Sequence, residues 1–158
     1  RDNLDNAPMD RSKRIGAILD TLAPALTRAE DLGVVMVMEN IKDTDPADRL
    51  AVVQQADSTA LRLSVDTGHA HWAHTRAGAP PADRFISGAG DMLGHVHLQD
   101  TDGHADRHWA LGCGNITWHG VFEALQRCGT APHLIVEIND FDRVQDSVAH
   151  LERLGLAQ

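Results

Sequence analysis

Side chains that can bind a metal ion or move a proton occur at the ends of four apolar runs. The runs cover residues 34–38, 61–65, 93–96 and 133–136, and the side chains at their ends are Glu39, Asp66, His97 and Glu137. One such residue alone could simply cap a strand near solvent. Three carboxylates held close together repel one another, and a divalent cation removes that conflict. The set therefore predicts one divalent metal ion, either Mn, Mg, Co or Zn.

Helical patterns separate these apolar runs, which are typical of short, buried parallel strands. The expected strands are residues 34–39, 61–66, 93–99 and 133–138, and the expected helices include residues 8–31, a helix that Thr117 caps, and residues 141–154. Strands that alternate with helices indicate a parallel α/β sheet with right-handed crossovers. In a closed barrel of this type, the C-terminal ends of the strands form the active-site face. The four side chains should therefore point at one place.

The length of the chain limits how much of such a barrel it supplies. A complete (β/α)8 barrel needs roughly 250 residues, whereas this chain has 158. We expect a single domain over residues 1–158, of the α/β TIM-barrel type, with about four βα units of an eight-unit barrel. The chain begins at Arg1 rather than Met, which favours a fragment or a processed chain.

Three further residues have types and spacings suited to the same site. His69 lies three residues after Asp66, and Gly68 between them allows a tight turn that brings both side chains inward. Asp106 and His108 lie two apart in a long polar loop, residues 100–115, and loops of this length in compact domains are often functional. The alternative for His69 is a structural role at a helix N-terminus, where it hydrogen-bonds the preceding loop. The alternative for Asp106 and His108 is that they belong to a solvated loop without a function.

Other reactive side chains are predicted to be structural. His95 lies on the same strand face as His97 but one layer deeper. We expect it to be a hydrogen-bonded histidine inside the barrel. His71 and His74 should pack at the rim of the site. Cys128 lies on an apolar helix face and reads as a core residue.

Composition excludes several classes of protein. Hydrophobic content of 42% and charged content of 23% are those of a globular protein rather than a disordered one. A net charge of -9 disfavours a nucleic-acid partner, which usually requires a basic surface. Two cysteines are too few for a disulfide framework, so we expect the reducing cytoplasm. No signal peptide or membrane-spanning run is apparent, so no membrane is expected as a partner.

The order of the motifs resembles a known family. Glu39-Asn40, Asp66-Thr67-Gly68-His69, His95-Val96-His97-Leu98-Gln99-Asp100, Asp106-Arg107-His108, Leu111-Gly112-Cys113-Gly114 and Val136-Glu137-Ile138 follow one another. The chain resembles the sugar phosphate isomerase/epimerase proteins of the xylose isomerase-like TIM-barrel superfamily, which also includes endonuclease IV. The resemblance covers the whole chain but only the C-terminal half of the family's barrel. The motif set is specific for the superfamily, not for a substrate.

The resemblance implies roles for the candidate residues. Its metal ligands correspond to Glu39, Asp66, His97 and Glu137, while His69 corresponds to a substrate-facing or second-metal histidine. Asp106 and His108 match the pair that holds a further zinc in endonuclease IV-like members, although that site also needs histidines from earlier strands. Arg107 lies in the loop where epimerases of the family place a substrate-binding arginine.

The leading hypothesis is a metal-dependent isomerase or epimerase of a small sugar, sugar phosphate or polyol ketone that acts through an enediolate. Glu39 and Glu137 lie on the first and last strands, so one could remove a proton and the other return it. The alternatives are an endonuclease IV-like phosphodiester hydrolase, a dehydratase of the same superfamily, and an inactive metal-binding half-barrel.

A half-barrel also has implications for partners. An isolated four-strand half would expose two sheet edges and much of its interior. We expect either self-association, in which two copies complete one barrel around a two-fold axis, or a missing N-terminal half that does so, with this chain as part of a longer parent. The remaining partner is the small sugar-like substrate.

Overall fold

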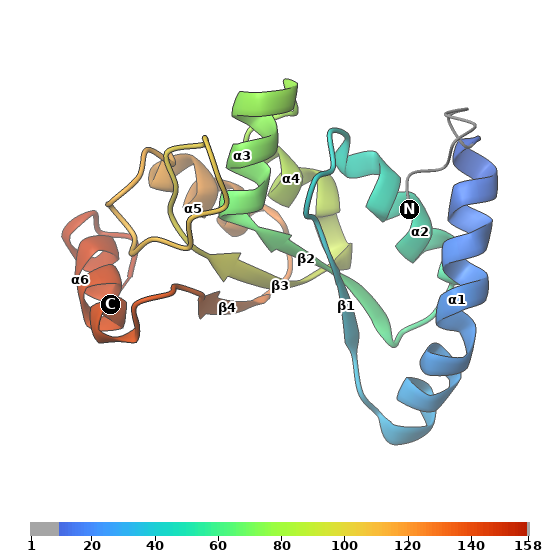
Figure 1. Cartoon of the computed structure of the whole chain (residues 1–158). Helices are drawn as coiled ribbons and strands as arrows, with labels where there is room; N and C mark the ends of the chain where they lie inside the picture. Colours follow the sequence, from blue (N-terminus) through green and yellow to red (C-terminus); the bar gives the residue numbers. More distant parts are fainter. Residues whose placement is uncertain (1–9, 158) are drawn as a thin grey trace.

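The computed structural model describes residues 10–157 and contains four parallel strands in the order β1-β2-β3-β4 (Figure 1). The strands are β1 (Met36–Glu39), β2 (Leu61–Asp66), β3 (Leu93–Leu98) and β4 (His133–Val136). The helices are α1 (Arg11–Leu32), α2 (Pro46–Ala56), α3 (Thr67–Ala77), α4 (Ala82–Ala89), α5 (Trp118–Arg127) and α6 (Val144–Arg153), with short 3-10 turns η1 (Gly90–Met92) and η2 (Phe141–Arg143). This architecture confirms the predicted α/β class with about four βα units.

Three predicted strands are too long by one or two residues. The β1 ladder starts where Met36 donates its backbone N–H to Ala60, because the Val34 N–H is already bonded to Ala29 at the end of α1. After β4, the backbone N–H of Asn139 bonds to His108, so the chain has turned away from the sheet towards the long loop. The expected start of the first helix at residue 8 lies outside the described residues.

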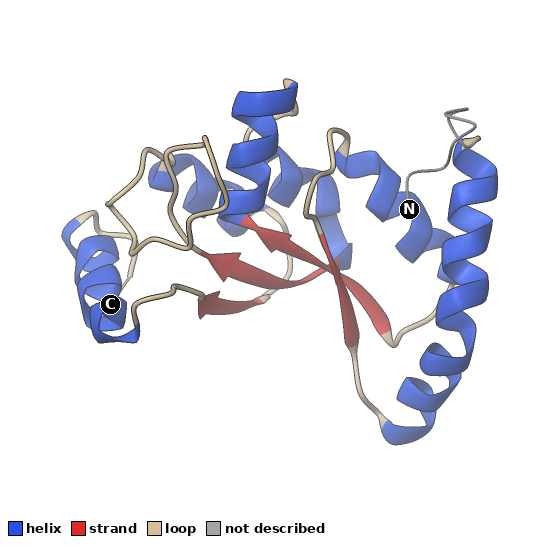
Figure 2. Cartoon of the chain, viewed as in Figure 1, coloured by secondary structure: helices blue, strands red, loops and turns tan. Residues whose placement is uncertain are grey.

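The helices lie along one face of the sheet. In Figure 2, α2 to α5 form a layer on one side of the strands, while α1 and α6 lie at the two ends. The core between these layers includes Phe85 and Ile86 of α4, Val121 of α5 and Val96 of β3, all 3% exposed or less. This layer fixes the positions of β2 and β3 in the middle of the sheet.

The opposite face of the sheet is open in the described part of the chain. Side chains alternate along a strand, and those facing away from the helices include Val35, Val37 and Ile135, which are 56%, 43% and 47% exposed. The expectation of buried strands therefore holds for β2 but is wrong for β1 and β4. Both are edge strands with a neighbouring strand on one side only, and in β4 Leu134, on the face opposite Ile135, is also 42% exposed.

Two predicted helix details need correction. Thr117 precedes α5, but its side chain makes no capping hydrogen bond. The last predicted helix divides into η2 and α6, and Asp140 caps η2 by accepting from the Asp142 N–H. None of the helices among residues 10–157 is long and apolar enough to cross a membrane.

Candidate metal centre

The four predicted metal ligands lie at the C-terminal edge of the sheet. Glu39 and Asp66 end β1 and β2, His97 is the penultimate residue of β3, and Glu137 directly follows β4. Asp66 and His97 are partners in the parallel register of β2 and β3. The architecture therefore brings together the residues that the sequence pattern grouped.

His97 lies between the two glutamates. Its Nδ1 atom is 2.8 Å from Glu39 Oε2 and 2.8 Å from Glu137 Oε2. The same nitrogen is buried and makes no hydrogen bond of acceptable geometry. Three polar atoms thus converge without satisfying one another, which is an arrangement expected of ligands that face a common cation.

Asp66 is completely buried beneath this cluster. Its Oδ1 atom accepts from the backbone N–H of His69 at 2.7 Å and so caps α3. Its Oδ2 atom is buried without a hydrogen-bond partner. Buried polar atoms in folded proteins are nearly always paired, so a buried carboxylate oxygen without a protein partner fits a metal ligand.

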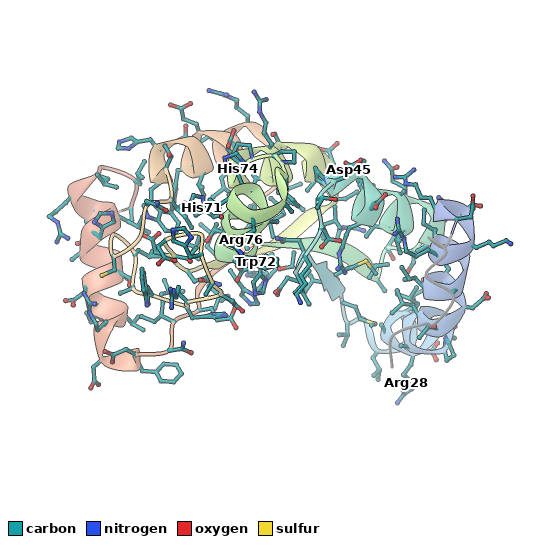
Figure 3. All side chains as sticks on the ribbon, turned by 45° about the horizontal axis from the view of Figure 1, so that its top comes forward. Arg28, Asp45, His71, Trp72, His74 and Arg76 are labelled. Atoms are coloured by element: carbon teal, nitrogen blue, oxygen red, sulfur yellow. The ribbon has the colours of Figure 1, made fainter. Side chains whose placement is uncertain are left out.

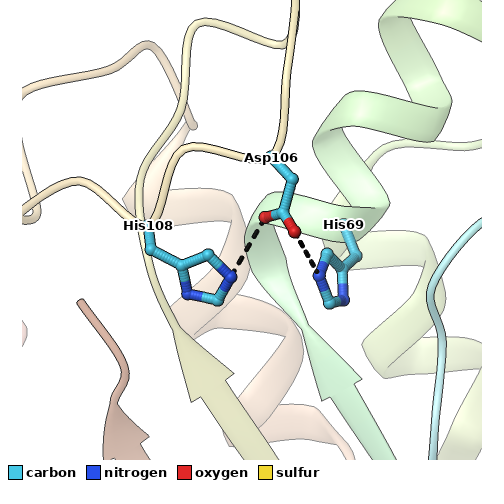
Figure 4. Close-up of side chains that lie close together, drawn as sticks. All are labelled: His69, Asp106 and His108. Atoms are coloured by element: carbon cyan, nitrogen blue, oxygen red, sulfur yellow. Dashed lines mark hydrogen bonds and ion pairs between the residues drawn. The ribbon is translucent and has the colours of Figure 1, made fainter. Parts of the chain in front are cut away.

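A second group joins the long loop to the start of α3. Asp106 lies between two imidazoles, with Oδ2 3.2 Å from His69 Nε2 and Oδ1 3.1 Å from His108 Nε2 (Figure 4). His69 Nδ1 also lies 3.2 Å from Glu39 Oε1. His69 therefore connects the loop residues to the strand-end residues.

The donor atoms fit a divalent cation. Three sets of ligand atoms lie within 4.8 Å of one another: Glu39, Asp66 and His69; Asp66, His97 and Glu137; and His69, Asp106 and His108. Mixed carboxylate and imidazole ligands suit Mn, Co and Zn, and the carboxylates also suit Mg. With the two unpartnered atoms on Asp66 and His97, this chemistry supports a metal centre.

The charges of the cluster perturb one another's protonation. Burial raises the pKa of Asp66 to about 6, against the opposing charge of His69. For His69, burial alone would lower the pKa, but the hydrogen bond to Glu39 and the charges of Asp66 and Asp106 raise it to about 9. The hydrogen bond with His69 and the charge of His97 hold the pKa of Glu39 below its usual value, although burial opposes them.

Two buried amides support the cluster, and neither was among the predicted site residues. Asn40 accepts from the Asp66 N–H at 2.8 Å and donates to the Asp66 carbonyl at 3.2 Å. Gln99 donates to Asp66 Oδ1 and to Asp106 Oδ1. Their positions directly after β1 and β3 were a usable signal, because Glu39-Asn40 and Leu98-Gln99 stand at strand ends.

Gly68 serves a different purpose from the predicted one. It has no positive φ angle and lies within α3, so it makes no special turn. A Cβ atom at this position would instead overlap the side-chain amide of Gln99. The glycine is required for close approach between α3 and the residue that follows β3.

Arg107 is held within the loop. Its guanidinium pairs with Asp102 at 3.2 Å and lies 5.2 Å from the centre of the Trp109 ring. Only Nε and Nη2 bond to Asp102, so the other terminal nitrogen has no bond to this carboxylate. Its backbone carbonyl accepts from the Asn139 side chain at 3.1 Å, which ties the loop to the segment after β4.

The histidines predicted to be structural have local partners. His95 Nδ1 lies 3.0 Å from the Ser64 hydroxyl on the neighbouring strand, as expected of a hydrogen-bonded barrel histidine. His71 bonds to the Asn115 side chain and His74 to the Ala79 carbonyl. His71 and His74 are therefore engaged outside the cluster, whereas the His95 ring also packs edge-on against His97, with ring centroids 4.6 Å apart.

A pocket of about 250 Å³ opens beside the cluster. His69 and Asp106 form the wall that it shares with the metal centre, and Ile41, Lys42 and Trp72 form much of the rest. Lys42 Nζ lies 5.9 Å from the centre of the Trp72 ring. Figure 3 shows Trp72 and Arg76 on α3, where Trp72 projects from the helix near the site. The pocket offers an aromatic face and one cation next to the candidate ligands.

Comparison with known proteins identifies the family. The profile of the xylose isomerase-like TIM barrel family matches residues 5–154. The chain therefore belongs to this family, and the resemblance inferred from the motifs is confirmed.

Individual relatives agree with this assignment. The chain is 32% identical over 130 residues to MJ1311, an uncharacterized protein of Methanocaldococcus jannaschii, covering 75% of this chain and 43% of that protein. A D-tagatose 3-epimerase-like protein is 27% identical with a TM-score of 0.73, covering 88% of this chain and 53% of that one. The TTHB071 protein of Thermus thermophilus, solved after soaking with ZnCl2, is 26% identical with a TM-score of 0.70, covering 97% of this chain and 58% of that one. The chain spans about half the length of the proteins it matches.

Proposed function

We propose that this chain carries the metal-binding and proton-transfer half of an isomerase or epimerase that acts on a small sugar, sugar phosphate or polyol ketone. The observation that carries the proposal is the convergence of Glu39, His97 and Glu137 above Asp66, which leaves His97 Nδ1 and Asp66 Oδ2 without hydrogen bonds. The likeness to a D-tagatose 3-epimerase-like protein supports a sugar substrate. We also infer that residues 1–158 form a single domain equivalent to the C-terminal half of the barrel.

Glu39, Asp66, His97 and Glu137 are the residues that would hold the divalent cation. When bound, such a cation supplies a Lewis acid that stabilises negative charge on the oxygens of a carbonyl substrate. Asp66 is the most rigidly held member of the set because it is fully buried and has two hydrogen bonds. Its Oδ1 atom accepts from the His69 N–H, and its own N–H donates to the Asn40 side chain. The three ligands above it are more exposed and can face a substrate.

Glu39 and Glu137 are the proposed proton carriers. They approach His97 from opposite edge strands, and their side chains are 26% and 44% exposed. One carboxylate would remove the proton from the carbon beside the carbonyl, giving an enediolate, and the other would deliver a proton to the opposite face. The lowered pKa of Glu39 keeps it ionised at neutral pH, although it also limits its basicity.

The pocket beside the cluster would bind the rest of the substrate. The Trp72 ring offers a flat apolar surface for the carbon–hydrogen face of a sugar. His69 and Asp106, on the shared wall, would accept and donate hydrogen bonds to substrate hydroxyls. In this role His69 and Asp106 bind the substrate and are not ligands of a second metal ion.

The test is a screen of ketoses and inososes with the metal-loaded protein and two variants, Glu39→Gln and Glu137→Gln. Each variant should lose at least about 100-fold in kcat, the scale of general acid–base catalysis, while it still binds the substrate. Solvent deuterium should enter the substrate in the wild-type reaction. If both variants turn over at the wild-type rate, neither glutamate carries the proton.

A second function is favoured by one observation, the triad of His69, Asp106 and His108. Such a group could hold a further zinc, as required by an endonuclease IV-like phosphodiester hydrolase. The net charge of -9 opposes a DNA substrate. The number of bound metal ions distinguishes the two functions. One ion per site supports the isomerase, whereas three zinc ions together with cleavage of abasic DNA support the nuclease.

A dehydratase would release water from the same substrates, and an inactive half-barrel would bind metal without turnover.

We further propose that the open face of the sheet is covered in the functional protein. The exposed Val37 on β1 and Ile135 on β4 lie on the two edge strands that a closed barrel would bury. Either a second copy or a missing N-terminal half of the barrel would supply the remaining strands. Both described cysteines, Cys113 and Cys128, are free thiols, as proposed for a cytoplasmic protein.

A further inference from the structure

Gln99 occupies the space between the sheet, α3 and the long loop. It follows β3 directly and is 0% exposed. Its amide approaches the backbone of Gly68 so closely that any side chain at that position would collide with it. Its own backbone also bonds to the buried Thr67 hydroxyl, both through the N–H at 3.1 Å and through the carbonyl at 2.8 Å. The residue is therefore fixed from several sides.

The side chain of Gln99 links the two groups of candidate ligands. Its Nε2 atom donates to Asp66 Oδ1 at 3.2 Å and to Asp106 Oδ1 at 3.1 Å. Its Oε1 atom accepts from the backbone N–H of His108 at 3.0 Å. The two carboxylates require donors, so the partners determine which end of the amide is nitrogen. Both amide hydrogens and one oxygen lone pair are thereby used.

The contact with His108 holds an unusual backbone conformation. His108 has a φ angle of 48°, in the left-handed region that residues other than glycine rarely adopt. Gln99 bonds to its N–H, and the Asn139 N–H bonds to its carbonyl at 3.0 Å. In this conformation the imidazole Nε2 faces Asp106 Oδ1. Because Asp106 is half exposed on a loop, few other contacts fix it.

We propose that Gln99 is a positioning residue that holds Asp106 and His108 against His69 and turns Asp66 so that its Oδ2 atom is left for a metal ion. The part that concerns the metal ion rests on the function proposed above. Gln99 acts through the residues it binds and needs no contact with substrate. One neutral amide can donate to two acids at once, which neither a hydroxyl with its single hydrogen nor a carboxylate can do.

The experiment uses trypsin cleavage after Arg107 as a measure of loop opening, followed by mass spectrometry on the native, metal-free chain at pH 8. Gln99→Glu has the same shape but lacks both donors, and Gln99→Met is uncharged and of similar volume. Cleavage should accelerate by about 10-fold or more in each variant, because cleavage of a native loop follows its opening equilibrium. Ser147→Ala is the matched control, since Ser147 is also buried and anchors the same loop through the Leu111 N–H at 3.1 Å.

The control should leave the cleavage rate after Arg107 within about threefold of the wild-type value, because it acts on a distant part of the loop. If Gln99 only fills space, the isosteric Gln99→Glu variant should be cleaved after Arg107 at the wild-type rate. That result would overturn the proposal. Gln99→Met remains informative if the charged variant does not fold. Mn²⁺ titration by calorimetry provides the second readout, with affinity expected to fall about 10-fold in Gln99→Met.

The two readouts separate this inference from the function on which it rests. If the wild-type chain binds no Mn²⁺, the proposed metal centre fails, but protection of Arg107 still tests the positioning of the loop. If Mn²⁺ binds equally to the wild type and to Gln99→Met, and Arg107 remains protected in both, Gln99 has no positioning role. Faster cleavage together with weaker Mn²⁺ binding supports the inference in full.

Discussion

Asp66 and His97 are register partners on adjacent parallel strands, and they carry the two buried side-chain atoms that have no hydrogen-bond partner among residues 10–157. The unpartnered atoms are a carboxylate oxygen and an imidazole nitrogen, both good ligands for a divalent cation. In a protein stabilised only by its own contacts, two such neighbours would be expected to bond to each other or to other protein groups. Their positions therefore indicate that function, rather than stability, determines this part of the sheet.

Replacing Asp66 should separate metal binding from stability. Asp66→Asn removes a buried carboxyl group, and burial raises the pKa of that group to about 6. Asparagine can still cap α3. We expect Mn²⁺ affinity to fall at least about 100-fold, while the melting temperature of the metal-free chain stays equal or rises. Calorimetry and thermal denaturation measure the two effects.

Asp45→Asn is the matched control for that experiment. Asp45 caps α2 by accepting from the Ala47 N–H, and it belongs to none of the candidate metal sets. Its replacement should leave Mn²⁺ affinity unchanged. An Asp66→Asn variant that binds Mn²⁺ as tightly as Asp45→Asn would remove Asp66 from the ligand set.

The metal-free chain should lose stability as pH rises from about 4 to 9. A group whose pKa is raised on folding stabilises the fold below its ordinary pKa, and this stabilisation is lost as pH rises through the folded value. For Asp66 the window runs from 3.8 to about 6, and for His69 from 6.5 to about 9. The loss across the His69 window should be roughly 1–2 kcal/mol after solvent screening.

Added Mn²⁺ should reverse this trend. Metal ligands bind in their deprotonated forms, so stabilisation by the ion grows with pH. Melting temperatures at pH 5, 7 and 9, with and without Mn²⁺, test both parts. A metal-free chain that is most stable at pH 9 would contradict the proposed protonation of His69.

Replacing Trp72 should weaken substrate binding more than turnover. The ring lines the pocket beside His69 and Asp106 but lies in none of the candidate metal sets. For Trp72→Ala we expect KM to rise about 10-fold, which corresponds to about 1.4 kcal/mol of lost contact, with kcat changed little. Arg76→Ala on the same helix should change neither constant. A fall in kcat at unchanged KM would show that the ring does not bind the substrate.

Charged substitutions on the open face should reveal what covers the sheet. If two copies complete one barrel, Val37→Asp should convert the assembly to monomers in sedimentation analysis, because the edge of β1 would be buried. Phe141→Asp is the control, since Phe141 is 83% exposed and lies outside the sheet. A wild-type chain that is monomeric at micromolar concentration would instead favour the missing N-terminal half of the barrel as the cover.

The sequence was sufficient for the parallel sheet and for the grouping of the site residues. Apolar runs that end in Glu39, Asp66 and Glu137 predicted both the strands and the edge at which these side chains meet. This succeeded because the C-terminal ends of parallel strands share one side of a sheet. The positions of individual atoms, such as the free Oδ2 of Asp66, depend on hydrogen bonds from distant residues and could not be read from spacing.

Supporting residues were harder to predict than ligands. Asn40 and Gln99 are amides, whose chemistry by itself suggests neither metal binding nor proton transfer. Their role depends on which carboxylates they meet across the fold, over sequence separations such as that between Gln99 and Asp66. Likewise, the exposed faces of β1 and β4 follow from their places at the edges of the sheet, whereas their sequences are as apolar as that of β2.

The location of Glu39 and Glu137 on the two edge strands has a mechanical consequence. Asp66 and His97 lie on the central strands, which pair directly despite one register shift between Leu63 and Ser64, but the separation of the two glutamates depends on how strongly the whole sheet curves. Whatever closes the open face sets that curvature. If the two glutamates transfer protons as proposed, the geometry of that transfer is coupled to assembly, and a chain that binds the metal ion would still need the right curvature to turn over substrate.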